Sequence, residues 1–191
     1  MGFPLVWRGL VLAAIAGLRV GEIWVSWRRL TRDGAAQGAR ALQEPGFPVM
    51  VLVHAGWFAG CAVEGLFWPA AWWPGLAAWA ATLWALSLAL RAWVMVSLGR
   101  FWNVRLVRRA QQPVVTRGPY RWLRHPNYLA VILEITAVPL LLGAYWTAAL
   151  ASIANAAVLI SRIRREEAYL FTSPEYAQAF SHKARLIPGL F

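Results

Sequence analysis

One stretch of the sequence decides the fold class: residues 74–98 read PGLAAWAATLWALSLALRAWVMVSL, with Arg91 as their only charged residue. About 20 consecutive apolar residues are enough for an α-helix to cross a bilayer. A soluble domain carries about a quarter of its residues as charged side chains, whereas this chain of 191 residues is 60% hydrophobic and 14% charged. The sequence therefore predicts an all-α integral membrane protein.

Outward from this stretch, four more apolar runs bring the expected number of transmembrane helices to about five. Short uncharged connections at Pro69 to Gly75 and at Gly143 to Trp146 predict two tight helical hairpins. The start of the chain has no small-residue cleavage site before its first basic cluster, so we expect a retained helix, not a signal peptide. The expected spans are Phe3 to Trp27, Phe47 to Trp68, Pro74 to Leu98, Pro126 to Leu142 and Thr147 to Ile160, the last continuing through Arg162 to Phe171.

The charge is strongly basic, with 19 Lys and Arg against 8 Asp and Glu. Basic residues gather in segments 27–48 and 99–125 and from residue 162 onward, and five spans place all three segments on one side. The positive-inside rule makes that side cytoplasmic, with the amino terminus outside and the protein in an inner (plasma) membrane. The clusters suit a lipid surface better than nucleic acid, and most of these arginines could serve as topology signals alone.

The most unusual polar stretch is residues 117–128, RGPYRWLRHPNY. Gly118-Pro119 predicts a turn. Because His125 precedes a proline, it is disfavoured as a helical residue, and Pro126 should open the fourth helix. An imidazole, two tyrosines and several guanidiniums then surround a helix amino terminus, which suits a carboxylate or a phosphate.

A second polar cluster, RIRREE at residues 162–167, lies where the fifth helix leaves the membrane. Arg162 and Glu166 share a face, and Glu167 points about 100° further round the helix. Because helices four and five form a hairpin, this cluster should meet His125 on one face of the membrane. Its acids could bind ribose hydroxyls or an ammonium group, and an Arg162–Glu166 ion pair would by itself explain Glu166.

Taken in order, these motifs resemble the isoprenylcysteine carboxyl methyltransferase family over about half of the chain, from Leu90 to Phe180. The matching residues are Gly118-Pro119-Tyr120, Arg124-His125-Pro126-Asn127-Tyr128, Arg162 to Glu167, and Tyr176 with Phe180. Within the family, the segments at 99–103, 117–121 and 162–167 are most similar to a bacterial branch associated with type III polyketide synthases, which methylates hydroxyls of alkylpyrones and alkylresorcinols.

The resemblance implies S-adenosyl-L-methionine as methyl donor, bound at the cytoplasmic edge, and a lipophilic acceptor that arrives from the bilayer. It also implies a functional link to a type III polyketide synthase. Residues 1–98 are expected to form the membrane bundle where the acceptor enters. Residues 99–191 are expected to form the cofactor-binding half, with helices four and five and the cytoplasmic tail.

Nine residues are candidates for the site. His125 is the strongest, as a contact for the donor's carboxylate, whereas tyrosines at a membrane interface and a basic residue after a span are commonplace. The three histidines are scattered, so no metal site is expected. The expected donor-binding residues are Tyr120, Arg124, His125, Pro126, Tyr128 and Glu167, and the expected catalytic residues are Arg162, Glu166 and Asn103.

Four ionisable residues fall inside apolar runs, namely Glu22, Glu64, Arg91 and Glu134. A charge at mid-membrane costs about 2.5 to 3.5 kcal/mol on an insertion scale, so these side chains should face the bundle or a cavity. We expect them to pair with one another, for example Arg91 with Glu64 or Glu134, with catalysis as the alternative.

Three other functions compete with methylation of a hydroxyl. The acceptor could be the carboxylate of a thioether lipid. A nicotinamide-dependent membrane reductase could use the same helix start to bind phosphates. A non-enzymatic scaffold could bind anionic lipid through its arginine-rich loops.

Overall fold

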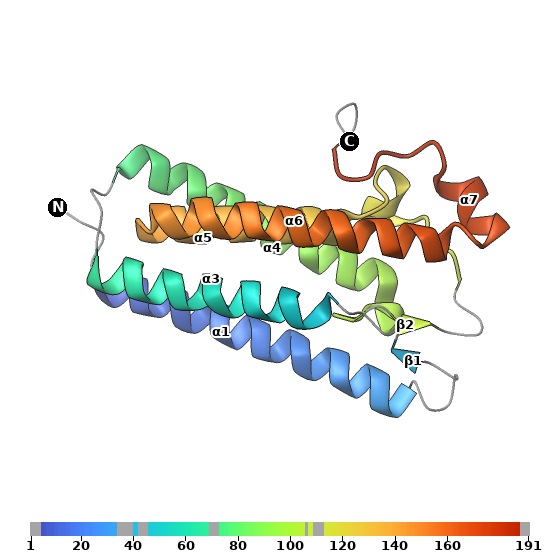
Figure 1. Ribbon diagram of the computed structural model, residues 1–191, viewed down its shortest axis with the longest axis horizontal. Coiled ribbons are helices and arrows are strands. Elements are labelled where there is room, and N and C mark those ends of the chain that lie inside the picture. The colour runs from blue at the N-terminus through green and yellow to red at the C-terminus, as the bar shows by residue number, and fades with distance from the viewer. Residues whose placement is uncertain are drawn as a thin grey trace.

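The structure, a computed structural model, describes residues 5–33, 40–41, 46–68, 73–105, 107–108 and 113–187. It is an α-helical bundle whose long helices run side by side along one axis (Figure 1). The predicted fold class is confirmed, and the predicted bounds of the third and fourth helices are those observed. The long helices are α1 (Leu5–Arg28), α3 (Phe47–Phe67), α4 (Pro74–Leu98), α5 (Pro126–Leu142) and α6 (Tyr145–Leu170).

Four of these helices, α1, α3, α4 and α6, are long and apolar enough to cross a membrane. The exception is α5, whose 17 residues extend about 25 Å along the helix axis, slightly less than the roughly 30 Å of a hydrocarbon core. Its side chains are mostly buried among the other helices, so α5 forms the centre of the bundle. α6 begins two residues before the predicted span and continues to Leu170, as the extended helical pattern predicted.

Exposed tryptophans lie near both ends of the long helices. Trp7 and Trp27 on α1 are 20 residues apart, as are Trp73 and Trp93 at α4, and all four are well exposed. Twenty helical residues span about 30 Å, which is the thickness of the hydrocarbon core. These side chains are therefore spaced as two interfacial aromatic belts.

The short elements gather at one end of the bundle, on the right of Figure 1. The described parts of the three arginine-rich segments lie at this end, as predicted, and we call it the arginine-rich end. Residues 69–72 of the predicted turn between α3 and α4 lie outside the described residues. The short elements are a π-helical turn (Arg29–Asp33), two antiparallel strands of two residues each, β1 (Arg40–Ala41) and β2 (Val107–Arg108), 3-10 turns at Gly99–Phe101 and Gly118–Arg121, and α7 (Pro174–Phe180).

The core of the bundle joins α1, α3, α5 and α6. Ile15, Trp57, Ile135 and Leu142 are buried against one another in one cluster. α3 and α6 also approach closely: a Cβ atom at Gly60 would lie 2.7 Å from the Thr147 hydroxyl oxygen. A small residue at such a crossing is typical of helices packed in lipid.

Four charged side chains form an ion cluster inside the bundle. Arg19 and Glu22 of α1 pair at 2.6 Å, and Arg91 of α4 pairs with Glu134 of α5 at 2.5 Å. The two pairs also contact each other, through Arg19–Glu134 at 3.2 Å and Arg91–Glu22 at 3.4 Å. The predicted pairing of Arg91 with Glu134 is confirmed, and we call these four residues the ion quartet.

Glu64 pairs differently from the prediction, because it lies at the opposite end of the bundle from Arg91. Its carboxylate accepts hydrogen bonds from the backbone N–H groups of Trp146 and Thr147 and from the Thr147 hydroxyl, at 2.7 to 3.0 Å. A carboxylate at a helix amino terminus satisfies unpaired N–H groups and complements the helix dipole. Nearby, Arg8 of α1 donates to the Gly65 carbonyl of α3 at 2.6 Å. Charged side chains therefore join α3 to both α1 and α6 at this end of the bundle.

We predict that Glu64→Ala lowers the thermal stability of the detergent-purified protein by about 1–2 kcal/mol, because it removes the cap of α6. Glu64→Gln should lose less, since the amide oxygen still accepts. The lipid-facing neighbour Val63 is the control, and Val63→Ala should melt like the wild type. Equal melting temperatures for Glu64→Ala and Val63→Ala would contradict the capping role.

Candidate active site

The turn before α5 packs tightly against α4. Gly118 has a φ of 62°, a left-handed conformation that favours glycine, and a Cβ atom there would overlap the Ser97 hydroxyl. Trp93 and Trp122 meet edge to face, with ring centroids 5.8 Å apart. Pro126 then opens α5 as predicted, with His125 outside the helix at φ −125°. α4 therefore fixes where His125 enters the site.

The carboxy-terminal tail runs alongside this turn. The backbone N–H groups of Arg124 and His125 donate to the carbonyls of Ala184 and Arg185, at 2.8 and 3.0 Å. The Arg124 guanidinium also donates to the carbonyls of Ser181 and Lys183. These contacts hold the RHPNY segment and the tail together as one layer.

Glu167 on α6 lies at the centre of this layer. Its carboxylate forms hydrogen bonds with the His125 imidazole at 3.1 Å, the Arg124 guanidinium at 3.3 Å and the Arg185 guanidinium at 2.9 Å. Glu167 and His125 are both buried. The predicted meeting of the two polar clusters is confirmed by these contacts.

Glu166, the residue before Glu167 on α6, contacts Tyr128. The Tyr128 hydroxyl donates to its carboxylate at 2.5 Å, and the Tyr128 ring stacks on His125 at 5.4 Å between centroids. Burial raises the pKa of the Tyr120 phenol, and the Glu166 carboxylate raises it further. Burial and the same carboxylate raise the pKa of Tyr176. The raised pKa keeps both phenols protonated near neutral pH, so neither is suited to act as a base.

Arg162, one turn earlier on α6, also lies beside Tyr128. Its guanidinium is 5.7 Å from the Tyr128 ring centroid and donates to the Val104 carbonyl at 2.8 Å. It also contacts the Met50 sulfur. A guanidinium and a carboxylate, on Arg162 and Glu166, therefore both contact the side chain of Tyr128.

Asn103 is held by α1. Ser26 donates its hydroxyl to the Asn103 side-chain oxygen at 2.6 Å, and the Asn103 amide donates back to the Ser26 carbonyl at 3.3 Å. The backbone N–H of Arg105 donates to the same side-chain oxygen. These contacts give Asn103 a structural task, and its predicted catalytic role stays a prediction.

Comparison with known proteins identifies the family. The sequence pattern of the isoprenylcysteine carboxyl methyltransferase (ICMT) family matches residues 80–172, which include α5, α6 and Glu167 with its partners Arg124 and His125. The chain is also 37% identical over 162 residues to the uncharacterised protein YpbQ of Bacillus subtilis (strain 168), covering 83% of this chain and 93% of that protein. The chain belongs to the ICMT family. It is therefore an integral membrane protein of a methyltransferase family.

Enzymes of the ICMT family use S-adenosylmethionine as methyl donor, and the residues around Glu167 suit that molecule. Its amino acid portion carries a carboxylate, which cations such as Arg124 and Arg185 would attract, and an ammonium, which Glu166 or Glu167 would attract. The buried side-chain oxygen of Asn127 has no hydrogen-bond partner among the residues that the structure describes. Since an unpaired buried acceptor is costly, this atom is suited to accept a hydrogen bond from an adenine amine or a ribose hydroxyl.

Sequence reasoning missed Arg185, Lys183 and Asn127. The tail's basic residues were counted as topology signals, but Arg185 contacts Glu167, and Lys183 donates to the Tyr120 carbonyl at 2.8 Å. Asn127 stands inside the RHPNY motif, next to two chosen residues, and its position could have identified it. The tail has no periodic pattern that would reveal its partners.

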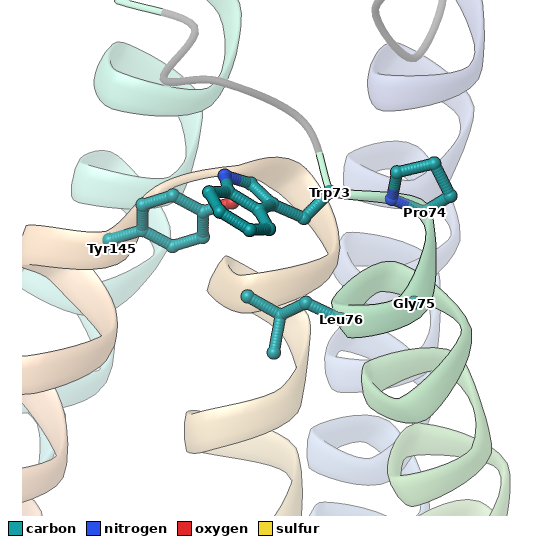
Figure 2. A pocket seen from close by; sticks show the side chains of 5 residues that line it. All are labelled: Trp73, Pro74, Gly75, Leu76 and Tyr145. Carbon is teal, nitrogen blue, oxygen red and sulfur yellow. The ribbon is translucent and has the colours of Figure 1, made fainter.

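Two open clefts lie at opposite ends of the described bundle. One, of about 500 Å³, lies between the exit of α4 (Leu98 to Phe101) and residues 113–117 at the arginine-rich end. The other, of about 400 Å³, is shown in Figure 2, where Trp73 and Tyr145 face one another above Leu76. The second cleft is mostly apolar and far from the carboxylates of α6, so the candidate site is the polar cluster at the arginine-rich end.

We predict that Glu167→Gln destabilises the protein by about 3 kcal/mol, because Arg124 and Arg185 lose the negative charge that Glu167 places between them. The value is at the lower end for buried pairs, since the Arg185 side chain is 40% exposed. Chemical denaturation in detergent would measure it. The exposed Glu175 is the matched control, and Glu175→Gln should unfold like the wild type. A wild-type midpoint for Glu167→Gln would refute the central role of this carboxylate.

We also predict that Gly118→Ala weakens donor binding. The left-handed backbone costs a residue with a Cβ about 1–2 kcal/mol, and the new methyl group would push the turn away from Ser97. Isothermal titration with S-adenosylhomocysteine would measure the loss. Gly75 has no atom within 4 Å of a Cβ position, so Gly75→Ala should bind normally.

Proposed function

We propose that the protein is an S-adenosylmethionine-dependent O-methyltransferase that methylates a ring hydroxyl of a lipophilic alkylpyrone or alkylresorcinol. One observation carries the proposal: the Glu166 carboxylate and the Arg162 guanidinium both contact Tyr128, beside the cluster around Glu167. The family supplies the reaction type. The pairing of an acid with a cation supports the choice of acceptor.

A hydroxyl acceptor needs both groups. A phenol has a pKa near 10, so a base must take its proton or a cation must lower its pKa. Glu166 is placed to accept the proton, and Arg162 to stabilise the oxygen anion. A carboxylate acceptor is already ionised at neutral pH and would need only the cation.

In this proposal the donor binds around Glu167, next to the face of α6 that carries Arg162 and Glu166. The Arg124 and Arg185 guanidiniums and the His125 imidazole surround Glu167, and Tyr120 and Tyr128 provide hydroxyl groups nearby. When bound, the donor would supply the methyl group of its sulfonium. The rest of the donor would leave as a neutral thioether. The chain's own contribution is alignment of the two reactants and exclusion of water.

The membrane setting follows from the same arrangement. Arginines gather at the end that carries the site, and the positive-inside rule then puts this end in the cytoplasm, at the inner membrane of a bacterium. The acceptor would enter from the surrounding lipid. A type III polyketide synthase is the class of enzyme that would supply it.

The test uses detergent-purified protein, labelled donor, and a panel of alkylpyrones, alkylresorcinols and prenylcysteine analogues. We expect a methyl ether on the ring lipids. Glu166→Gln should lower kcat on hydroxyl acceptors by about 100-fold or more, the usual contribution of a general base, and should change turnover of carboxylates little. Arg162→Gln should lower kcat on both, whereas Gln at the exposed Arg164 should be silent.

Other outcomes would overturn the proposal in distinct ways. Methyl esters formed only on prenylcysteine analogues would make the protein a carboxyl methyltransferase. Binding of a nicotinamide dinucleotide in preference to S-adenosylhomocysteine would indicate a reductase. Absence of donor binding, with lipid binding unchanged in His125→Ala, would indicate a scaffold.

A further inference from the structure

The ion quartet consists of two pairs that are each neutral. Arg19 and Glu22 neutralise one another within α1, and Arg91 and Glu134 neutralise one another between α4 and α5. Neither side therefore needs the other to cancel its net charge. The cross contacts Arg19–Glu134 and Arg91–Glu22 instead fix the position of α1 relative to α4 and α5, because each cation must face the anion of the other pair.

The position is defined along the helix axis. Sliding α1 by one turn would move its charges by about 5.4 Å, which would break both cross contacts or bring like charges together. Buried polar groups that fix the register of packed helices are the best-attested use of such ion pairs. The quartet lies six to nine residues before the end of α1, hence about 10–14 Å inside the arginine-rich end.

The end of α1 holds the segment that follows α4. Three hydrogen bonds join Ser26 to it: the Ser26 hydroxyl donates to Asn103, the Asn103 amide donates to the Ser26 carbonyl, and the Val104 N–H donates to the Ser26 hydroxyl oxygen at 3.2 Å. Arg29 adds a contact, because its guanidinium donates to the Trp102 carbonyl.

The same segment supports Arg162. Val104 binds α1 through its N–H and accepts a hydrogen bond from the Arg162 guanidinium through its carbonyl. A continuous path of contacts therefore runs from the quartet along α1 to Ser26, then through Val104 to Arg162. Moving α1 by one turn would carry Ser26 away from Val104 and remove a contact that holds the Val104 carbonyl in place for the Arg162 guanidinium.

We propose that α1 is a positioning element for methyl transfer: the ion quartet sets its register, and Ser26 with Asn103 then fixes the segment that orients Arg162. This inference rests on the proposed function, because Arg162 is the group that contacts the acceptor's oxygen. Ser26 and Asn103 are positioning residues, and their effect reaches the reaction through Arg162.

The first experiment removes the contact at the end of α1. Ser26→Ala and Asn103→Ala should each lower kcat at least tenfold, with the Kd for S-adenosylhomocysteine unchanged, because the donor side of α6 is untouched. Ser26→Thr retains the hydroxyl and should restore kcat. The matched control is Ser87, a buried serine of α4 that donates to the Ala130 carbonyl, and Ser87→Ala should keep its kcat. Wild-type kcat in Ser26→Ala would overturn the proposal.

The second experiment exchanges charges within the quartet. Arg91→Glu with Glu134→Arg keeps that pair neutral but turns both cross contacts into like-charge contacts, so kcat should fall while donor binding persists. Adding Arg19→Glu with Glu22→Arg should restore kcat, because all four contacts are again between opposite charges. Full activity of the double exchange would mean that the quartet sets no register.

A readout independent of the reaction separates this inference from the proposed function. In a Cys61→Ser background, Ser26→Cys with Asn103→Cys places two thiols where the side chains now touch. A disulfide should form with the native quartet, fail with the double exchange and return with the fourfold exchange. Disulfide formation in all three would overturn the inference, even if the protein methylates none of the acceptors tested.

Discussion

The site depends on one carboxylate. Glu167 is buried, and three side chains from two distant segments, Arg124, His125 and Arg185, converge on it. Without a counter-charge, two guanidiniums could not lie this close together in a partly buried layer. The ionic contact thereby decides where the RHPNY turn and the tail lie relative to α6, and the remaining polar side chains of the site are arranged around it.

Much of the fold could be predicted from the sequence because the helices are long apolar runs with prolines and glycines at their ends. Pro74 and Pro126 begin α4 and α5 as predicted. The meeting of His125 with Glu167 was also predictable, since a tight hairpin returns the end of α6 to the beginning of α5. In each case, a local pattern and the length of a span are sufficient.

Contacts between non-neighbouring segments could not be predicted in this way. Spacing places Arg162 and Glu166 on one face, but it does not reveal that Val104 accepts from one and Tyr128 donates to the other. The suggested Arg91–Glu64 pair was wrong because antiparallel helices put these residues at different depths. Ser26 carries no signal at all in the sequence, since a serine on a membrane helix is ordinary.

The shortness of α5 bears on how a lipid could reach the site. The Thr136–Ser152 hydrogen bond aligns α5 with α6, so Pro126 is level with about residue 162, and α6 extends roughly 12 Å beyond the start of α5. The turn before α5 thus lies about 12 Å short of the end of α6 along the helix axis. Lifting an alkyl chain of about fifteen carbons into water would cost roughly 12 kcal/mol, at about 0.8 kcal/mol per methylene. For the lipophilic acceptor proposed above, a reaction at the depth of this turn would leave the alkyl chain in the leaflet throughout.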